Sequence, residues 1–321
     1  METKRDLLAI DDFTPDEFTK IIEWAISAKQ DDGLFDEFLP LTGLTIGSIY
    51  EKPSTRTRVS FEVGIDKLGG NPLTLLKGDI QLGKSESIED TAAVLSRYLG
   101  AITYRCFGHE DVEKLAKGST VPVINALSDK HHPCQAAADM MTIAENFDDL
   151  TGIKVAWVGD GNNVLHDLML GSVALGMNIH YAVPKGFEPD ENIVSRAKEI
   201  AKKSGGSVEL THDPIEAVKD ANVVYTDVFV SMGEEHLEDK MQSFDGFQIN
   251  EELVAHADSN YIFMHCLPAH RGEEVTDGVI DSKNSVVFDQ AENRMWAQMS
   301  LLAYLVSNEA WETMGEFMGI A

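Results

Sequence analysis

The stretch KVAWVGDGNNVLHDLMLGSVA, residues 154–174, carries the pattern that decides the fold. Its opening residues 154–158 predict a buried strand, the Gly- and Asn-rich residues 159–163 predict a tight loop, and the apolar residues 164–174 predict a helix. Similar elements follow it, with predicted strands at 178–183, 222–226, 261–265 and 285–288 and a predicted helix at 192–203. Strands that alternate with helices are typical of parallel βαβ units. The stretch therefore predicts an α/β fold built on a parallel sheet.

An equivalent set of elements precedes this stretch. The segment Thr14-Pro-Asp-Glu17 predicts a helix start, because Thr and Glu form a capping box and Pro favours the first helical position. Residues 44–50 predict a strand, and a polar loop and an amphipathic helix follow it. The apolar run from about 292 to 307 predicts a buried helix that crosses back to this first module. With 321 residues, the chain is long enough for two domains or for one large α/β unit.

The composition excludes several classes of protein. Hydrophobic residues make up 43% and charged residues 25%, so a sizeable core can form and global disorder is excluded. The 54 acidic and 26 basic residues give a net charge of −28, which repels phosphate backbones and argues against a nucleic-acid partner. Two explanations of the acidity stay open: a surface that aids solubility and adaptation to a salt-rich cytosol.

The cysteines and the first residues of the chain indicate a reducing compartment. Only Cys106, Cys134 and Cys266 are present, without CxxC spacing, so a disulfide framework is not expected. The first residues lead into a mixed polar stretch that lacks the apolar region of a signal peptide. No run approaches the ~18 apolar residues that span a bilayer. We therefore expect a cytoplasmic protein with no membrane partner.

The segment Ser54-Thr-Arg-Thr-Arg58 lies between the predicted strand and helix of the first module. Free backbone N–H groups and the helix dipole favour an anion at a helix start, and arginine forks suit phosphate oxygens. The segment thus predicts a phosphate site, although it is no P-loop, because G-x-x-x-x-G-K-[ST] is absent. The alternative is an ordinary hydroxyl cap with surface arginines.

The Gly-rich loop at 159–163 follows a strand and opens a helix, as a dinucleotide fingerprint does. Two of the required features are missing, because Val164 replaces the third glycine and no acidic residue ends the next strand. We therefore expect the loop to present the amides of Asn162 and Asn163 at the carboxyl end of a strand, where α/β sheets bind ligands. Packing alone is the remaining alternative.

Three further polar clusters lie at expected strand ends, where α/β proteins place their chemistry. They are residues 131–135, Asp227 with the residues after it, and residues 265–268. Zinc is a competing interpretation of the histidines and cysteines, but their scattered spacing fits no usual ligand set, and we expect no metal. Two other interpretations also stay open. Cys266 could be a nucleophile, and His265 could be a histidine that only makes hydrogen bonds at the end of its strand.

Five blocks together resemble one known family. They are STRTRVSFE at 54–62, HPCQ at 132–135, DVFVSMG at 227–233, HCLP at 265–268 and DQAENR at 289–294. In this order, over essentially the whole chain, they are similar to the blocks of the aspartate/ornithine carbamoyltransferase family. The third and fourth blocks look like those of the members that act on ornithine. Each block alone is weak, whereas the joint match is specific.

The resemblance implies a fold and an assembly. Two parallel-sheet α/β domains would be linked by long interdomain helices, with the active site in the cleft and a homotrimer, or a higher assembly of trimers, as the quaternary structure. Residues 1–146 would bind carbamoyl phosphate, with a C-terminal helix at about 297–321 packed back on them. Residues 147–296 would bind L-ornithine. No cofactor is implied, because the carbamoyl group arrives activated on phosphate.

The resemblance also implies roles for individual residues. Carbamoyl phosphate would be held by Ser54, Thr55, Arg56, Thr57, Gln81 (reaching into a neighbouring subunit), Arg105, His132, Gln135, Cys266, Leu267 and Arg294. L-Ornithine would be held by Asn163, Asp227, Ser231 and Met232. The catalytic set would be Arg56, Arg105, His132, Asp227, Cys266 and Arg294.

The implied reaction gives L-citrulline, in arginine metabolism, and phosphate. An ammonium group with a pKa of about 10.4 is almost fully protonated at neutral pH, so the site must bind or create the neutral amine. Competing hypotheses are a sister carbamoyltransferase that uses putrescine, an acylated ornithine or aspartate, an NAD-dependent oxidoreductase, and a non-catalytic relative. An aspartate enzyme should offer cations to a second carboxylate, and HCLP at 265–268 is not the HPLPR type.

Overall fold

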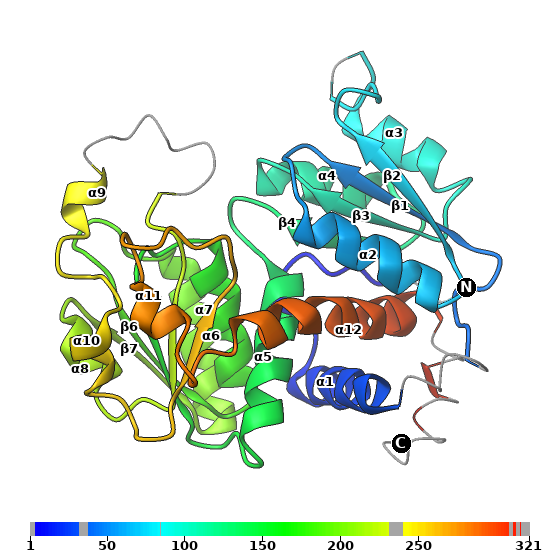
Figure 1. Ribbon diagram of the computed structural model, residues 1–321. Helices are drawn as coiled ribbons and strands as arrows, with labels where there is room; N and C mark the ends of the chain where they lie inside the picture. The colour runs from blue at the N-terminus through cyan, green and yellow to red at the C-terminus, as the bar shows by residue number, and fades with distance from the viewer. Residues whose placement is uncertain are drawn as a thin grey trace. The chain divides into compact units, whose positions relative to one another are not determined.

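The computed structural model describes residues 4–31, 38–83, 85–230, 240–307, 311–312 and 315. The chain divides into two compact units (Figure 1). The first unit comprises Met1–Met141 and Glu292–Ala321, and the second comprises Thr142–Ala291. Each unit contains one parallel sheet, so the predicted pair of parallel-sheet α/β domains is confirmed. No helix in the described ranges is both long and apolar enough to cross a membrane.

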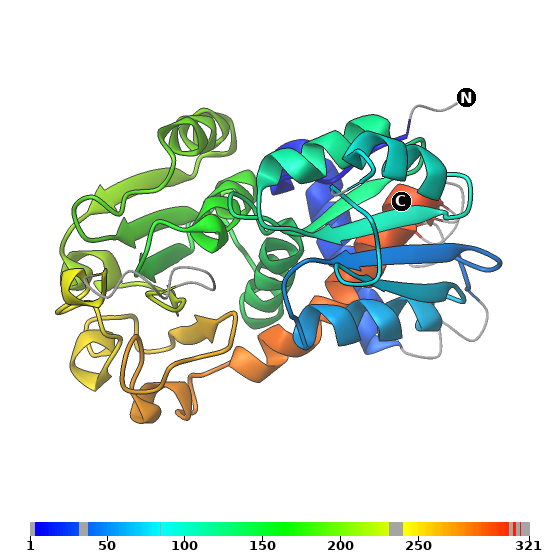
Figure 2. The same cartoon turned by 90° about the horizontal axis from the view of Figure 1, so that it is seen from above.

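The sheet of the first unit has the strand order β2-β1-β3-β4, and all neighbours are parallel. Its strands are β1 (Thr45–Tyr50), β2 (Asn71–Leu76), β3 (Ala101–Arg105) and β4 (Val123–Leu127). The connecting helices are α2 (Arg56–Lys67), α3 (Ile88–Leu95) and α4 (His109–Gly118). From β1 the chain goes first to β2, on one side, and then crosses β1 to reach β3 and β4 on the other side. Right-handed crossovers therefore place α2 on one face of the sheet and α3 and α4 on the other (Figures 1 and 2). The carboxyl ends of β1 and β3 therefore form a switch point, where such sheets bind ligands.

Three more helices complete the first unit or carry the chain across its boundary. They are α1 (Pro15–Gln30), α5 (Pro133–Asn146) and α12 (Val287–Val306), and a short 3-10 turn, η1 (Ile10–Asp12), precedes α1. Helix α12 packs on α1, where Ser300 donates to the Ile21 carbonyl at 2.7 Å. The predicted strand at 285–288 is wrong: Ser285 makes one bridge to Phe263, and α12 already begins at Val287. A short apolar run cannot distinguish a strand from the first turn of a buried helix.

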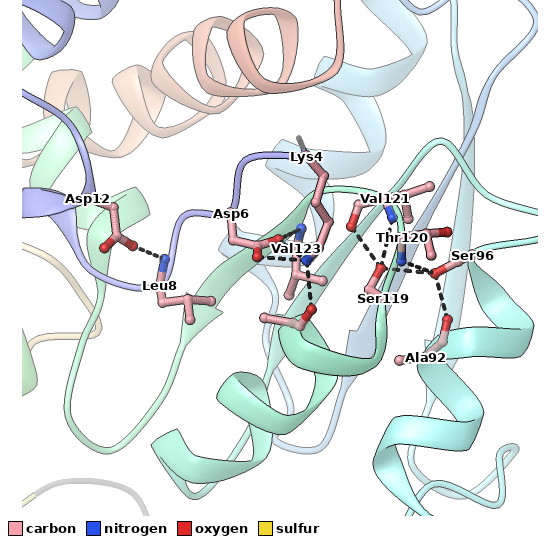
Figure 3. A network of polar contacts seen from close by, with 11 residues as sticks. Lys4, Asp6, Leu8, Asp12, Ala92, Ser96, Ser119, Thr120, Val121 and Val123 are labelled. Carbon is pink, nitrogen blue, oxygen red and sulfur yellow. Dashed lines mark hydrogen bonds and ion pairs between the residues drawn. The ribbon is translucent and has the colours of Figure 1, made fainter. Parts of the chain in front are cut away.

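The N-terminal segment extends the first sheet at β4. Leu7 forms a parallel bridge with Ile124. The Asp6 carboxylate accepts the Val123 N–H at 2.8 Å, and the Lys4 ammonium binds this carboxylate and a carbonyl of α4 (Figure 3). These contacts fix the chain start to the edge of the sheet that carries part of the candidate site.

The second unit repeats the architecture with the strand order β7-β6-β5-β8-β9, again parallel throughout. Its strands are β5 (Lys154–Val158), β6 (Asn178–Ala182), β7 (Ser207–Thr211), β8 (Val223–Thr226) and β9 (Ile262–His265). Its helices are α6 (Asn163–Ala174), α7 (Glu191–Ser204), α8 (Pro214–Val218), α9 (Lys240–Ser243), α10 (Glu251–Val254) and α11 (Asp277–Ile280). Helix α7 lies on one face of the sheet and α10 and α11 lie toward the other (Figure 2). The strand order reverses at β5 and β8, which predicts a ligand site at their carboxyl ends.

The predicted capping box at the start of α1 is confirmed and supports a stability test. Thr14 Oγ1 accepts the Glu17 N–H, and the Glu17 carboxylate accepts the Thr14 N–H. Thr14→Ala should therefore lower the free energy of unfolding by about 1 kcal/mol. Thr19→Ala, on the same helix but past its first turn, should leave this free energy unchanged or slightly raised, because Ala is the better helix former. Equal losses in urea titrations of both variants would contradict the role of the cap.

Candidate active site

The loop after β1 places Arg56 and Thr57 at the start of α2, the position that favours an anion. Thr57 is buried, and Arg56 is half-buried. Arg58 differs, because its guanidinium pairs with Glu62 at 2.9 Å and its side chain is 45% exposed. Arg58 is therefore a surface arginine, as the alternative interpretation of this segment expects. Arg56 and Thr57 lie at the switch point of the first sheet, beside the carboxyl end of β1.

A buried hydrogen-bond network joins three motifs that are far apart in the sequence. Arg294 donates to Thr57 Oγ1 at 2.8 Å and to Gln135 Oε1 at 2.6 Å. Gln135 in turn donates to Asp139 Oδ1 at 2.8 Å. All four side chains are buried. The guanidinium therefore connects the start of α2 with α5, and the Gln135 amide oxygen is oriented toward it.

Arg105 and His132 complete the polar cluster of the first unit. Arg105 ends β3, His132 lies directly before α5, and both are buried. Burial, followed by the nearby charges of Arg294 and Arg105, holds the pKa of His132 well below its usual value. His132 is therefore a neutral imidazole at pH 7, which can form hydrogen bonds without adding charge beside the arginines.

The lowered pKa of His132 predicts a specific loss of stability in acid. Below pH ~6.5 the unfolded chain binds a proton at this residue and the folded chain does not, so stability falls with pH until the folded pKa is reached. Between pH 7.5 and 5.5, the free energy of unfolding of the wild type should fall by about 1 kcal/mol more than that of His132→Gln. Parallel pH profiles in urea titrations would contradict a neutral His132.

The second unit brings together Asp227, Asn162 and Cys266 at the carboxyl ends of β8, β5 and β9. Asp227 Oδ2 accepts from Asn162 Nδ2 at 2.9 Å, and Asp227 Oδ1 accepts from the Cys266 thiol at 3.0 Å. Asn162 is also the N-cap of α6, because its Oδ1 accepts the N–H groups of Val164 and Leu165. Asn162 is thus the amide that contacts the candidate aspartate. The predicted Asn163 is the first residue of α6.

The Gly-rich loop is shaped by its packing. A Cβ on Gly161 would lie 2.3 Å from the Phe187 carbonyl oxygen and 2.4 Å from the Pro189 nitrogen. In the same loop Asp160 forms a buried ion pair with Lys240 at 2.7 Å. The packing alternative therefore explains Gly161, and no dinucleotide is needed to account for it.

The other predicted residues are found in different settings. Gln81 is exposed and Ser54 is half-buried, each in a loop that follows a strand of the first sheet. Leu267 is half-buried and adopts a positive φ of 57°. Ser231 and Met232 lie outside the described residues.

One group of possible metal ligands coincides with this cluster. Donor atoms of Asp227, His265 and Cys266 lie within 4.8 Å of one another. Both His265 nitrogens already take part in hydrogen bonds, Nδ1 with the Leu267 N–H and Nε2 with Glu274. A metal would have to displace one of these bonds, so we retain the prediction that the site uses no metal.

The motifs do not indicate Asp139, Glu274, or Asn162 as a direct partner of Asp227. Asp139 could have been found, because it lies four residues after Gln135 and so on the same face of α5. The contact of Asn162 with Asp227 spans 65 positions of the chain, and no local pattern predicts it.

The chain belongs to the aspartate/ornithine carbamoyltransferase family. The family model for its carbamoyl-P binding domain matches residues 5–145, and the model for its Asp/Orn binding domain matches residues 151–305.

Several ornithine carbamoyltransferases are similar to this chain over nearly its full length. Ornithine carbamoyltransferase from Pyrococcus horikoshii is 54% identical over 94% of this chain and 96% of the relative. A catabolic ornithine carbamoyltransferase from Thermoplasma acidophilum is 50% identical over 95% of this chain and 99% of the relative. The solved ornithine carbamoyltransferase from Pyrococcus furiosus has a TM-score of 0.92 at 54% identity and covers 96% of this chain and 98% of its own.

Proposed function

We propose that this chain is an ornithine carbamoyltransferase. It transfers the carbamoyl group of carbamoyl phosphate to the δ-amine of L-ornithine, giving L-citrulline and phosphate. The observation that carries the proposal is the position of Arg294, which bonds to Thr57 of the STRTR segment and to Gln135 of the HPCQ segment. Two motifs that the sequence assigns to one substrate thus belong to one buried cluster.

We assign the carbamoyl-phosphate half of the reaction to the first domain, residues 1–146 with the C-terminal residues from about 297. Backbone N–H groups at the start of α2 and the hydroxyls of Ser54, Thr55 and Thr57 suit phosphate oxygens. Arg56 and Arg105 supply the positive charge. The neutral His132 and the oriented Gln135 amide suit the carbamoyl oxygen and nitrogen.

We assign the ornithine half to the second domain, residues 147–296. Asp227 offers a buried carboxylate to the α-ammonium group, with Asn162 and Asn163 beside it. The Cys266 thiol contacts this carboxylate at 3.0 Å. Cys266 and the Leu267 carbonyl, which are also assigned to carbamoyl phosphate, would surround the carbon and the δ-amine that react. Ser231 and Met232 remain predicted partners of the α-carboxylate.

The chemistry follows from these assignments. The δ-nitrogen lone pair forms a bond to the carbamoyl carbon, the bond from this carbon to the phosphate oxygen breaks, and the proton that the nitrogen loses passes to the released phosphate. Negative charge develops on the carbamoyl oxygen and the departing phosphate, where preoriented donors from Arg56, Arg105, His132 and Arg294 are most effective. Asp227 holds the α-ammonium, so that the uncharged δ-amine is the group presented for attack.

We further propose a homotrimer located in the cytoplasm. Strand β2 is an edge of its sheet, and Leu73 and Leu76 on it and Val59 and Val63 on α2 are exposed apolar side chains. Such an edge is stabilised when another chain covers it. Light scattering should give three chain masses or a multiple of three. A monomer at all concentrations would contradict the assembly and the role of Gln81 in a neighbouring subunit.

A panel of amines tests the substrate assignment. With carbamoyl phosphate fixed, L-ornithine, putrescine, N-acetylornithine and L-aspartate are compared by kcat/KM. The proposal expects L-ornithine to exceed each of the others by at least about a hundredfold. Putrescine lacks the α-carboxylate, the acetyl group of N-acetylornithine blocks the α-ammonium that Asp227 would hold, and L-aspartate lacks the δ-amine. A preference for another amine would retain carbamoyl transfer and overturn the ornithine assignment.

A further inference from the structure

A buried carboxylate lies directly behind the candidate amine site. Glu274 is fully buried, and its Oε1 lies 3.2 Å from Nε2 of His265, which is also fully buried. His265 is the residue that ends β9, immediately before Cys266. Neither the five sequence blocks nor the assigned chemistry gives Glu274 a role.

The hydrogen bonds of His265 fix the state of its imidazole. Nδ1 accepts the backbone N–H of Leu267 at 2.9 Å, so this nitrogen carries no proton. The proton of the neutral ring is then on Nε2, which donates to Glu274. Glu274 therefore selects the tautomer that can accept the Leu267 N–H.

The same carboxylate also holds the far end of this loop. Glu274 Oε1 accepts the backbone N–H of His270. The backbone of Glu274 is itself fixed, because its carbonyl accepts the Ile249 N–H at 2.8 Å. One carboxylate oxygen thus binds the loop 266–269 on both sides, at His265 and at His270.

The loop needs such a restraint. Leu267 has a φ of 57°, a region that costs a non-glycine residue free energy and persists only where the surroundings enforce it. The conformation sets the direction of the Leu267 carbonyl and places the Cys266 thiol 3.0 Å from Asp227. A shift of this loop would move both groups relative to the aspartate.

We propose that Glu274 is a positioning residue for carbamoyl transfer, which acts through His265 to hold Cys266 and Leu267 against Asp227. This inference rests on the proposed function for its kinetic consequence. Its structural content is independent of that function, because the thiol position can be measured without turnover.

The test compares Glu274→Leu with two variants. Glu274→Gln keeps an acceptor oxygen for His265 and His270. Glu273→Leu is the matched control, because Glu273 is the adjacent acidic residue and its half-exposed carboxylate pairs with the half-exposed His270 ring at 3.4 Å. The readouts are citrulline kcat and KM, carbamoyl-phosphate binding by calorimetry, and the rate at which iodoacetamide alkylates Cys266. Mass spectrometry separates this cysteine from the buried Cys106 and Cys134.

We expect Glu274→Leu to lower kcat/KM for ornithine by about 30-fold, since small misplacements of reacting groups cost up to about a hundredfold. Carbamoyl-phosphate binding should weaken by about threefold at most, because Cys266 and Leu267 are the two of its assigned residues that lie in this loop and the others lie outside it. Cys266 should be alkylated about tenfold faster, because its thiol would move away from the Asp227 carboxylate, whose negative charge disfavours the reactive thiolate. Glu274→Gln and Glu273→Leu should resemble the wild type in all three readouts.

A second variant covers the case in which Glu274→Leu does not fold. His265→Gln retains a donor toward Glu274 and removes the acceptor for the Leu267 N–H, so the same kinetic loss and faster alkylation are expected. A Glu274→Leu or His265→Gln protein with lower thermal stability but unchanged kcat/KM and alkylation would overturn the proposal and leave a purely structural pair. If the wild type makes no citrulline, the proposed function fails, while the alkylation rates still decide whether Glu274 holds the loop.

Discussion

Arg56→Ala is expected to lower kcat for carbamoyl transfer by about a thousandfold while the protein stays folded. Arg56 lies at the start of α2, where its charge and the helix dipole would act on the same phosphate under the proposed function. Removing one preoriented donor from a developing negative charge costs about a hundredfold to a thousandfold in rate, and this donor also carries a full charge. Steady-state citrulline formation at saturating ornithine measures the loss, and a thermal melt checks the fold.

Arg58→Ala is the matched control. Arg58 lies on the same turn of α2, but its guanidinium pairs with Glu62 in an exposed ion pair, which contributes at most about 1 kcal/mol to stability. The control should therefore keep kcat within about twofold of the wild type. If Arg56→Ala retained near wild-type turnover, or if both variants lost activity equally, the assignment of this loop to the phosphate would be wrong.

Asp227→Asn is expected to raise the ornithine KM by about a hundredfold. The substitution keeps the shape of the side chain and removes the negative charge that the α-ammonium would contact in a buried site, where such hydrogen bonds are strong. The Asn162 amide would also face a second amide in place of a carboxylate. Initial rates over a range of ornithine concentrations, at saturating carbamoyl phosphate, measure the change.

Carbamoyl-phosphate binding gives the contrast for this variant. Its dissociation constant should stay within about twofold, because the residues assigned to it are mainly in the first domain. Asp245→Asn, which removes one acidic charge from an exposed position of the same unit, should leave both constants unchanged. Loss of both substrates together in Asp227→Asn would contradict the division of roles between the two domains.

Much of the fold could be predicted from local patterns. The strand–loop–helix unit at 154–174 and the capping box at Thr14 depend on neighbours within a few positions, and both are confirmed. The prediction of a strand at 285–288 also depended on a local pattern, and it is wrong. The last two residues of this segment, Val287 and the exposed Phe288, begin helix α12, and an apolar run this short does not distinguish a strand from a helix start.

For the candidate site, the sequence predicted the residues but not the contacts between them. Motifs located its residues, but their contacts depend on side chains that meet only in the folded chain. Arg294 and Thr57 are 237 positions apart, and no spacing rule predicts that one guanidinium joins Thr57 to Gln135. The contact of Asn162 with Asp227 likewise depends on the turn before α6, and the role predicted for Asn163 toward ornithine stays a prediction.

The most direct test of the account is to follow one labelled carbamoyl group. The wild-type protein is incubated with carbamoyl phosphate labelled with ¹³C at the carbonyl carbon and with L-ornithine, and the products are identified by mass spectrometry and a phosphate assay. The account predicts citrulline with the label on its ureido carbon and one phosphate released for each citrulline formed. Phosphate release without labelled citrulline, or no consumption of carbamoyl phosphate at any salt concentration, would contradict it.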